Sequence, residues 1–106
     1  MRLRLLAVAR RPPAWVESAL SDYARRLPRV LHFSAPLVPP APGHDRNPAR
    51  AFRAEGERLL ANITRDETVV VLDEHGESWT SVELAARLEA WQAAGADLAF
   101  LVGGAD

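Results

Sequence analysis

The chain has 106 residues, a formal net charge of −1 and no cysteine, and these features exclude several classes of protein. The length suits a single domain, residues 1–106, with one packed core. Disulfides, thiolate metal sites and cysteine nucleophiles are excluded, and the three histidines lie too far apart for a local metal motif. No stretch approaches the ~20 apolar residues that cross a bilayer, and the amino terminus lacks a secretory cleavage signal. We therefore expect a cytoplasmic protein with no metal and no membrane partner.

The charge is distributed unevenly along the chain. Residues 1–60 hold eleven arginines against five acidic residues, whereas residues 61–106 hold two arginines against nine acidic residues. All thirteen basic residues are arginine, whose planar guanidinium suits phosphate groups. The first half therefore favours a polyanionic partner. A codon bias toward arginine with ordinary solvated helix faces is the alternative.

Predicted strands and helices alternate from the amino terminus. Residues 3–8 form the first strand, and an apolar stripe then predicts a helix that Pro28 ends. A second strand covers residues 30–38, and Pro36 assigns it to a sheet edge because proline cannot donate to a ladder. The residues expected to face inward are Trp15, Val16, Ala19, Leu20, Tyr23, Ala24 and Leu27 of the helix, and Leu31, Phe33, Ala35 and Leu37 of the strand.

A proline-rich loop over residues 39–48 leads into a second predicted helix, with Asn47 as its cap and Pro48 as its first residue. Arg46, Arg50 and Arg53 cluster in the loop and the first turns. They form either a solvated face shared with Glu55 and Glu57, or a contact for RNA phosphates. The residues of this helix expected to face inward are Phe52, Leu59, Leu60 and Ile63.

The rest of the chain predicts a strand, a helix and a strand. Residues 68–73 are apolar on both faces, which indicates a strand in the middle of a parallel sheet. Thr80 and Glu83 form a capping box for a third helix, which Gly95 ends before a last strand at residues 97–102. Trp79 and Leu84 form a hydrophobic staple across that cap, and the buried face of the helix is Leu84, Ala85, Leu88 and Trp91. This order predicts an α/β fold with a mostly parallel open sheet and helices on both faces.

A candidate site lies where two of these strands end, because ligands of open parallel sheets bind at the carboxyl ends of strands. Leu72 precedes Asp73 in one turn, and Val102 precedes the paired glycines Gly103 and Gly104, which expose bare backbone to a ligand. We expect the two strand ends to lie side by side. Asp73 either orients a ligand group or only bonds turn amides.

Three common fingerprints are absent from the sequence. No G-x-S-x-G, G-x-x-x-x-G-K-[ST] or complete G-x-G-x-x-G is present, which argues against serine hydrolases, phosphate-loop proteins and dinucleotide-binding proteins. A nucleotide-binding module of flavodoxin-like topology would need a phosphate-cradling turn after the first strand. That turn reads A-R-R-P-P and contains no glycine.

Five ordered segments resemble a known family. They are R-L-R-L-L-A-V-A, W-V-E-S-A-L-S-D-Y-A-R-R-L-P, A-E-G-E-R-L-L, L-D-E-H-G-E-S-W-T-S and F-L-V-G-G-A-D, and together they resemble the bacterial 23S rRNA pseudouridine N(3)-methyltransferases of the SPOUT class. The resemblance implies an α/β-knot fold, a homodimer, S-adenosylmethionine as donor, and methyl transfer to a pseudouridine of 23S rRNA in the ribosome. It also implies that Leu72, Val102, Gly103 and Gly104 bind the donor.

The resemblance leaves two differences from the family. Its members continue into a knot-forming carboxyl-terminal segment, so we expect this chain to be an inactive truncated form. The alternative is a non-catalytic α/β fragment or a remnant that binds RNA or a partner. Glu77 stands where the family places Lys or Arg, which concerns the RNA-facing side. Asp73 is the candidate catalytic residue.

Overall fold

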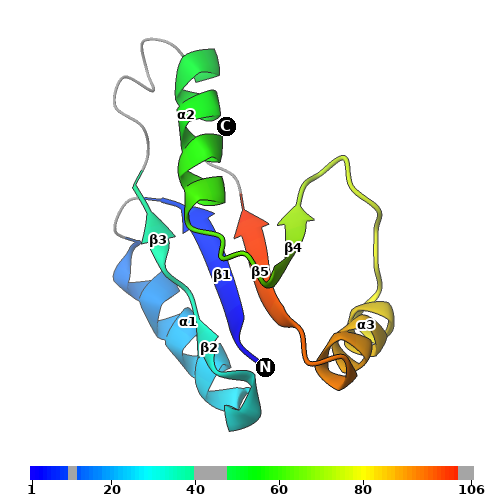
Figure 1. Ribbon diagram of the computed structural model, residues 1–106. Helices are drawn as coiled ribbons and strands as arrows, with labels where there is room; N and C mark the ends of the chain where they lie inside the picture. Colours follow the sequence, from blue (N-terminus) through cyan, green and yellow to red (C-terminus); the bar gives the residue numbers. More distant parts are fainter. Residues whose placement is uncertain (10–11, 40–47, 103–106) are drawn as a thin grey trace.

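The computed structural model describes residues 1–9, 12–39 and 48–102 (Figure 1). The elements follow one another along the chain as β1 (Leu3–Val8), α1 (Ala14–Arg26), a 3-10 turn (Arg29–Leu31), β2 (Phe33–Ser34), β3 (Leu37–Val38), α2 (Pro48–Ala61), β4 (Glu67–Leu72), α3 (Ser81–Ala93) and β5 (Asp97–Val102).

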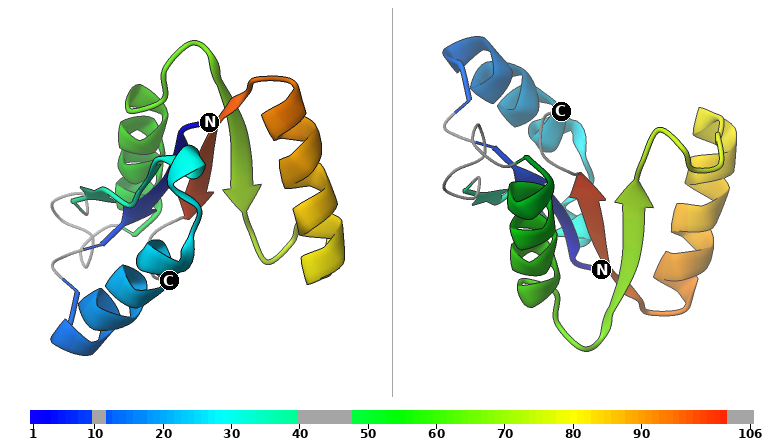
Figure 2. Two further views of the ribbon diagram at one scale, coloured as in Figure 1. Left: turned by 90° about the horizontal axis from the view of Figure 1, so that it is seen from below. Right: turned by 90° about the horizontal axis from the view of Figure 1, so that it is seen from above.

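All strand pairings among the described residues are parallel. The order across the sheet is β2-β1-β5-β4, and β3 also pairs with β1. Helix α2 covers one face, while α1 and α3 lie on the other side (Figure 2). The predicted α/β fold, with a parallel sheet and helices on both faces, is therefore confirmed.

The core lies between the middle of the sheet and α2. Strand β5 is its centre, since Ala99 is fully buried and Leu101 is 5% exposed. The small side chain of Ala99 leaves room above the sheet, where α2 contributes Leu59. The remaining members of this cluster are Leu6, Val8, Val38 and the partly buried Ile63.

The prediction that residues 68–73 form a middle strand is wrong. In the described part of the chain β4 pairs only with β5 and forms an edge of the sheet, while β5 takes the central place. Val71 is 62% exposed and Leu72 50% exposed. A strand that is apolar on both faces signals that both faces can be covered, but the residues themselves do not distinguish an edge from a centre.

The predicted second strand is present in two short pieces. β2 pairs with the start of β1 and β3 with its end, so the edge position is confirmed. The residues between the pieces include Pro36, which has no N–H for the ladder. The alternation changes phase there, because Val38 is buried and Leu37 is 43% exposed, contrary to the expected inward position of Leu37.

Several residues predicted to face inward on the helices are exposed. The stripe of α1 leaves Trp15 73% and Tyr23 63% exposed, and α2 leaves Phe52 66% and Leu60 63% exposed. These side chains lie on the flanks of helices that cover the sheet with only part of their apolar surface. Other expected inward residues that are exposed are Ala19, Leu27 and Ala85. Conversely, Glu55, expected on a solvated face, is buried.

A charged pair crosses the sheet beneath α2. Arg4 of β1 reaches diagonally over β5 to Glu67 of β4, donating from Nε to Oε2 at 2.8 Å. The backbone N–H of Thr64 donates to the other oxygen of Glu67, also at 2.8 Å. The hydrogen bonds from Arg4, opposed by burial and aided by Thr64, lower the pKa of Glu67 to about 2. The pair therefore links the open edge β4 to the centre of the fold.

Candidate functional site

The candidate site begins where β4 and β5 end next to each other. Leu72 is the direct Cα partner of Val102 in a parallel pair, so both strand ends point to the same edge (Figure 1). The six residues of β4 pair in register with the six residues of β5. Gly103 and Gly104 follow directly in the sequence and lie outside the described residues.

The turn after β4 is held by Asp73. Its carbonyl oxygen accepts a hydrogen bond from the N–H of Gly76 at 3.0 Å, and its carboxylate accepts one from the N–H of His75 at 3.4 Å. A Cβ at position 76 would lie 3.2 Å from that same carbonyl, so glycine suits the turn. Asp73 thus bonds turn amides, and its carboxylate is more than half exposed, which leaves it accessible to a ligand.

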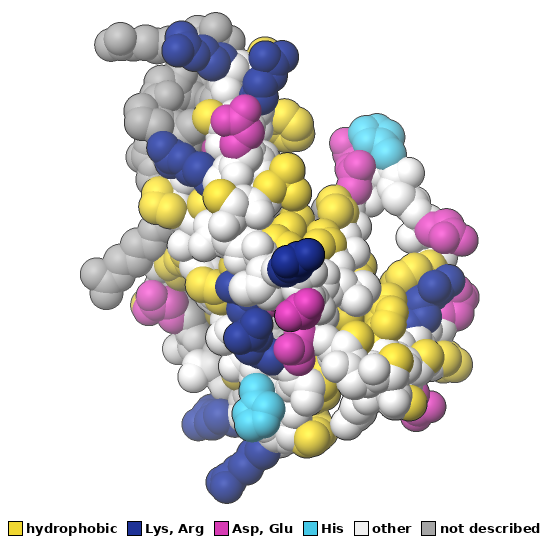
Figure 3. Space-filling model, viewed as in Figure 1, with side chains coloured by type: hydrophobic (Ala, Val, Ile, Leu, Met, Phe, Trp, Pro, Cys, Tyr) yellow, Lys and Arg dark blue, Asp and Glu magenta, His cyan; other side chains and the backbone are white. Residues whose placement is uncertain are grey.

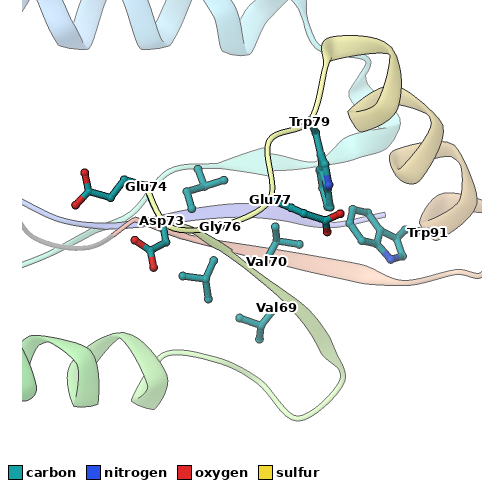
Figure 4. Close-up of a pocket in the computed structure, with 10 residues that line it drawn as sticks. Val69, Val70, Asp73, Glu74, Gly76, Glu77, Trp79 and Trp91 are labelled. Atoms are coloured by element: carbon teal, nitrogen blue, oxygen red, sulfur yellow. The ribbon is translucent and has the colours of Figure 1, made fainter.

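A cavity of about 650 Å³ lies beside β4, beneath the turn (Figure 4). Its volume falls within the range typical of small-molecule sites. Figure 4 shows the Glu77 carboxylate extending toward Trp91, below the indole of Trp79. The lining residues are Val69, Val70, Val71, Leu72, Asp73, Glu74, Gly76, Glu77, Trp79 and Trp91.

Helix α3 positions the aromatic wall of this cavity. Thr80 caps the helix by accepting from the N–H of Glu83 at 3.1 Å, which confirms the predicted cap. Trp79 and Leu84 line a second hollow of about 250 Å³ together with Phe100 of β5, and the staple contact between them stays a prediction. Gly95, at φ 73°, ends α3 and turns the chain into β5. The cap therefore sets where the Trp79 ring stands.

The Trp79 side chain has two notable contacts. The Arg87 guanidinium lies over its ring, with Cζ 4.2 Å from the centroid. Its Nε1 is buried and donates to no group among the described residues. The sequence predicts Trp79 as a staple residue and Trp91 as a core residue, and assigns neither to the cavity. No spacing pattern in the sequence signals that the two rings line one cavity.

The predicted arginine cluster lies at the same end of the molecule but outside the cavity. Arg50 and Arg53 are exposed on the first turns of α2, which begins at the end toward which the strands point (Figure 1). Arg46 lies outside the described residues. The structure thus brings Leu72 and Val102 together and keeps the described arginines apart from them.

The described residues hold no group of three or more His, Cys, Asp and Glu side chains arranged for a metal ion. None of their helices combines the length and apolar character needed to span a bilayer.

Comparison with known proteins links this geometry to one group. A family model described as a predicted SPOUT methyltransferase matches residues 1–106. Similar relatives include the ribosomal RNA large subunit methyltransferase H of Thioalkalivibrio sulfidiphilus, 44% identical over 98% of this chain and 67% of the relative. The proteins of the same name from Laribacter hongkongensis and Pseudomonas fluorescens are each 40% identical, over 100% and 98% of this chain and 69% and 68% of the relatives.

Proposed function

Because the chain belongs to the SPOUT methyltransferase family, we propose that it is an S-adenosylmethionine-dependent methyltransferase acting on N3 of a pseudouridine in 23S rRNA. The name shared by its relatives supports large-subunit ribosomal RNA as the substrate. The single observation that carries the proposal is the pairing of Leu72 with Val102 at the carboxyl edge of the sheet. Two adjacent strand ends offer a ligand main-chain groups from both turns at once.

The donor would be held by Leu72, Val102, Gly103 and Gly104. The cavity beside Leu72 fits this role, because its volume of about 650 Å³ suits a nucleoside-sized molecule and apolar valines form its floor. When bound, S-adenosylmethionine supplies a methyl group already activated by a positively charged sulfur. Side chains of the protein therefore need to position the reactants more than to activate them.

Asp73 is the candidate for orienting a polar group of the donor or the RNA. Its carboxylate stands at the end of β4 and is 56% exposed, so it can accept a hydrogen bond from a ligand while it keeps the turn closed. In the full-length form, we expect Asp73→Asn to lower the rate of methyl transfer by about tenfold, the loss of one charge-assisted hydrogen bond. A normal rate in this variant would leave Asp73 with only its turn role.

The RNA would meet the arginine-rich side of the molecule. Arg50 and Arg53 are exposed at the end of the molecule where the strands terminate, and Arg46 precedes them in the sequence. Guanidinium groups contact phosphates by paired hydrogen bonds, so these three residues would orient the RNA backbone rather than read its sequence. A homodimer acting on ribosomes in the cytoplasm completes the proposal.

The test is methyl transfer to ribosomes that lack this modification, by this chain and by a form extended to the length of its relatives. Isotope-labelled S-adenosylmethionine is supplied with the protein, and the labelled nucleotide is mapped by mass spectrometry of 23S rRNA fragments. Label on N3 of a pseudouridine is the expected result with the extended form, whereas the 106-residue chain, expected to be inactive, should add little or none. Label on another base or in 16S rRNA would contradict the proposed substrate.

A second candidate is a non-catalytic role in which the chain binds RNA or a protein partner. The observation that favours it is the open edge of β4, where Val71 is 62% exposed and available to another chain. RNA binding measured by filter retention, without any methyl transfer in the ribosome assay, would favour this candidate over the enzyme.

A further inference from the structure

The wall of the cavity opposite the valines carries aromatic and acidic side chains, and the proposed main-chain contacts to the donor do not involve them. Trp79 stands before the first turn of α3 and Trp91 near its last turn, and both line the cavity. The Glu77 carboxylate lies between the two indoles in the view of Figure 4. Two electron-rich rings and one carboxylate line the same cavity. Such a surface suits a cation whose charged atom bears apolar groups.

The charged residues that line the cavity are all acidic. Asp73, Glu74 and Glu77 line it, and its lining contains no Arg, Lys or His. Within the described part of the chain, no hydrogen bond or ion pair engages the side chain of Glu77. A nucleic-acid phosphate would be repelled here, whereas a cation would be attracted to an acceptor that is not already neutralised.

The Trp79 ring already contacts one cation, the guanidinium group of Arg87. Arg87 covers it at 4.2 Å, so the ring is oriented to interact with positive charge. Its Nε1 is buried and is not part of the accessible surface of the cavity. A bound cation would therefore meet the aromatic rings and the Glu77 carboxylate that line the cavity.

We propose that Trp79, Trp91 and Glu77 form a binding site for an alkylated onium cation, and that its ligand is the sulfonium group of the methyl donor. This inference rests on the proposed function for the identity of the donor. It assigns the three residues a specificity role, because the product of methyl transfer carries a neutral thioether at the same position. The wall therefore favours the charged donor over its product, which promotes exchange of one for the other.

The experiment uses the indole N–H signals of the three tryptophans in a ¹⁵N-labelled sample of the whole chain. Trp15 lies on α1, 73% exposed and away from the cavity lining, and serves as the internal control. Trimethylsulfonium, S-adenosylmethionine and S-adenosylhomocysteine are titrated separately, and signals are assigned with single Trp→Phe variants. We expect the first two compounds to shift the signals of Trp79 and Trp91 but not that of Trp15, with apparent Kd about two- to fivefold lower for the charged donor than for its product.

A pair of isosteric variants tests the carboxylate. Glu77→Gln should remove most of the preference for the charged donor, whereas Glu89→Gln, the same charge change on an exposed part of α3, should leave it unchanged. Equal responses to donor and product in the wild type, or shifts confined to Trp15, would overturn the inference even if ribosomes are methylated. If trimethylsulfonium and S-adenosylmethionine shift Trp79 and Trp91 as expected but a form extended to the length of the relatives methylates no rRNA, the site stands and the proposed function fails.

Discussion

At the scale of single residues, the pair of Arg4 and Glu67 makes stability depend on pH. The pKa of Glu67 is lowered to about 2 in the folded protein, below its value in the unfolded chain. The contribution is therefore complete above about pH 5 and is lost as the pH falls toward about 2, and the linkage is worth on the order of 3 kcal/mol. Urea unfolding at a series of pH values should show this loss on the acid side.

The variant Glu67→Gln should reproduce that loss at neutral pH. It keeps the shape of the side chain but leaves the Arg4 guanidinium, 17% exposed, without its carboxylate. We expect the free energy of unfolding to fall by about 3 kcal/mol and its dependence on acidic pH to weaken. Glu57→Gln, on the exposed side of α2, is the matched control and should change neither. An unchanged acid transition in Glu67→Gln would contradict the assignment.

This pair could not be predicted from the sequence. Arg4 and Glu67 lie 63 residues apart. Arg4 is a charged residue within one predicted strand, and Glu67 lies just before another. They meet only because β1 and β4 flank the same central strand, where Ala99 leaves space above the sheet. The cap residue Thr80 was predictable because its partner Glu83 is three residues away.

At the scale of elements, the cap of α3 controls the aromatic side of the cavity. Thr80→Ala removes the hydrogen bond to the N–H of Glu83 and should cost about 1 kcal/mol of stability. Because Trp79 directly precedes the cap, fraying of the first turn should also move its indole signal in the NMR spectrum. Ser78→Ala, at an exposed position in the turn before the cap, is the control. If the Trp79 signal does not move in Thr80→Ala, the cap does not control the position of the indole in the cavity.

Periodicity and capping located the helices and long strands, but not the faces that would be covered. The apolar stripe of α2 contained Leu59 and Leu60, of which only Leu59 is buried. The identity of the central strand also depended on pairing between distant segments. β5 is flanked by β1 and β4, which precede it by many residues, and no local pattern encodes that order.

At the scale of the whole molecule, the sequence predicted the position of the site at the carboxyl edge of the sheet, but not the side chains that line its cavity. Parallel strands with short turns imply that ligand contacts gather at the carboxyl ends, and Leu72 and Val102 do lie side by side there. The aromatic wall depends on how α3 folds back beside β4, which places Trp79 and Trp91 around one cavity. Such a juxtaposition follows from the angle of a helix to a sheet and not from residue spacing.

The exposed apolar surface beside β4 predicts association between copies of the chain. Figure 3 shows apolar side chains along the side of α2 that faces β4. Phe52 and Leu60 of α2 and Val71 of β4 are exposed. The outer edge of β4 also has no strand partner within the described residues. An exposed strand edge with an apolar flank is a template for pairing with another chain.

Val71→Lys should weaken that association, because a charge on an edge strand opposes pairing with a second strand. Sedimentation velocity over a range of concentrations should show the wild type shifting to larger species at concentrations where Val71→Lys stays monomeric. Val30→Lys places the same charge on another exposed valine, 50% accessible in the 3-10 turn and remote from β4, and should behave as the wild type. If both variants dissociate equally, net charge and not the β4 edge governs the association, and the surface beside β4 has no specific part in it.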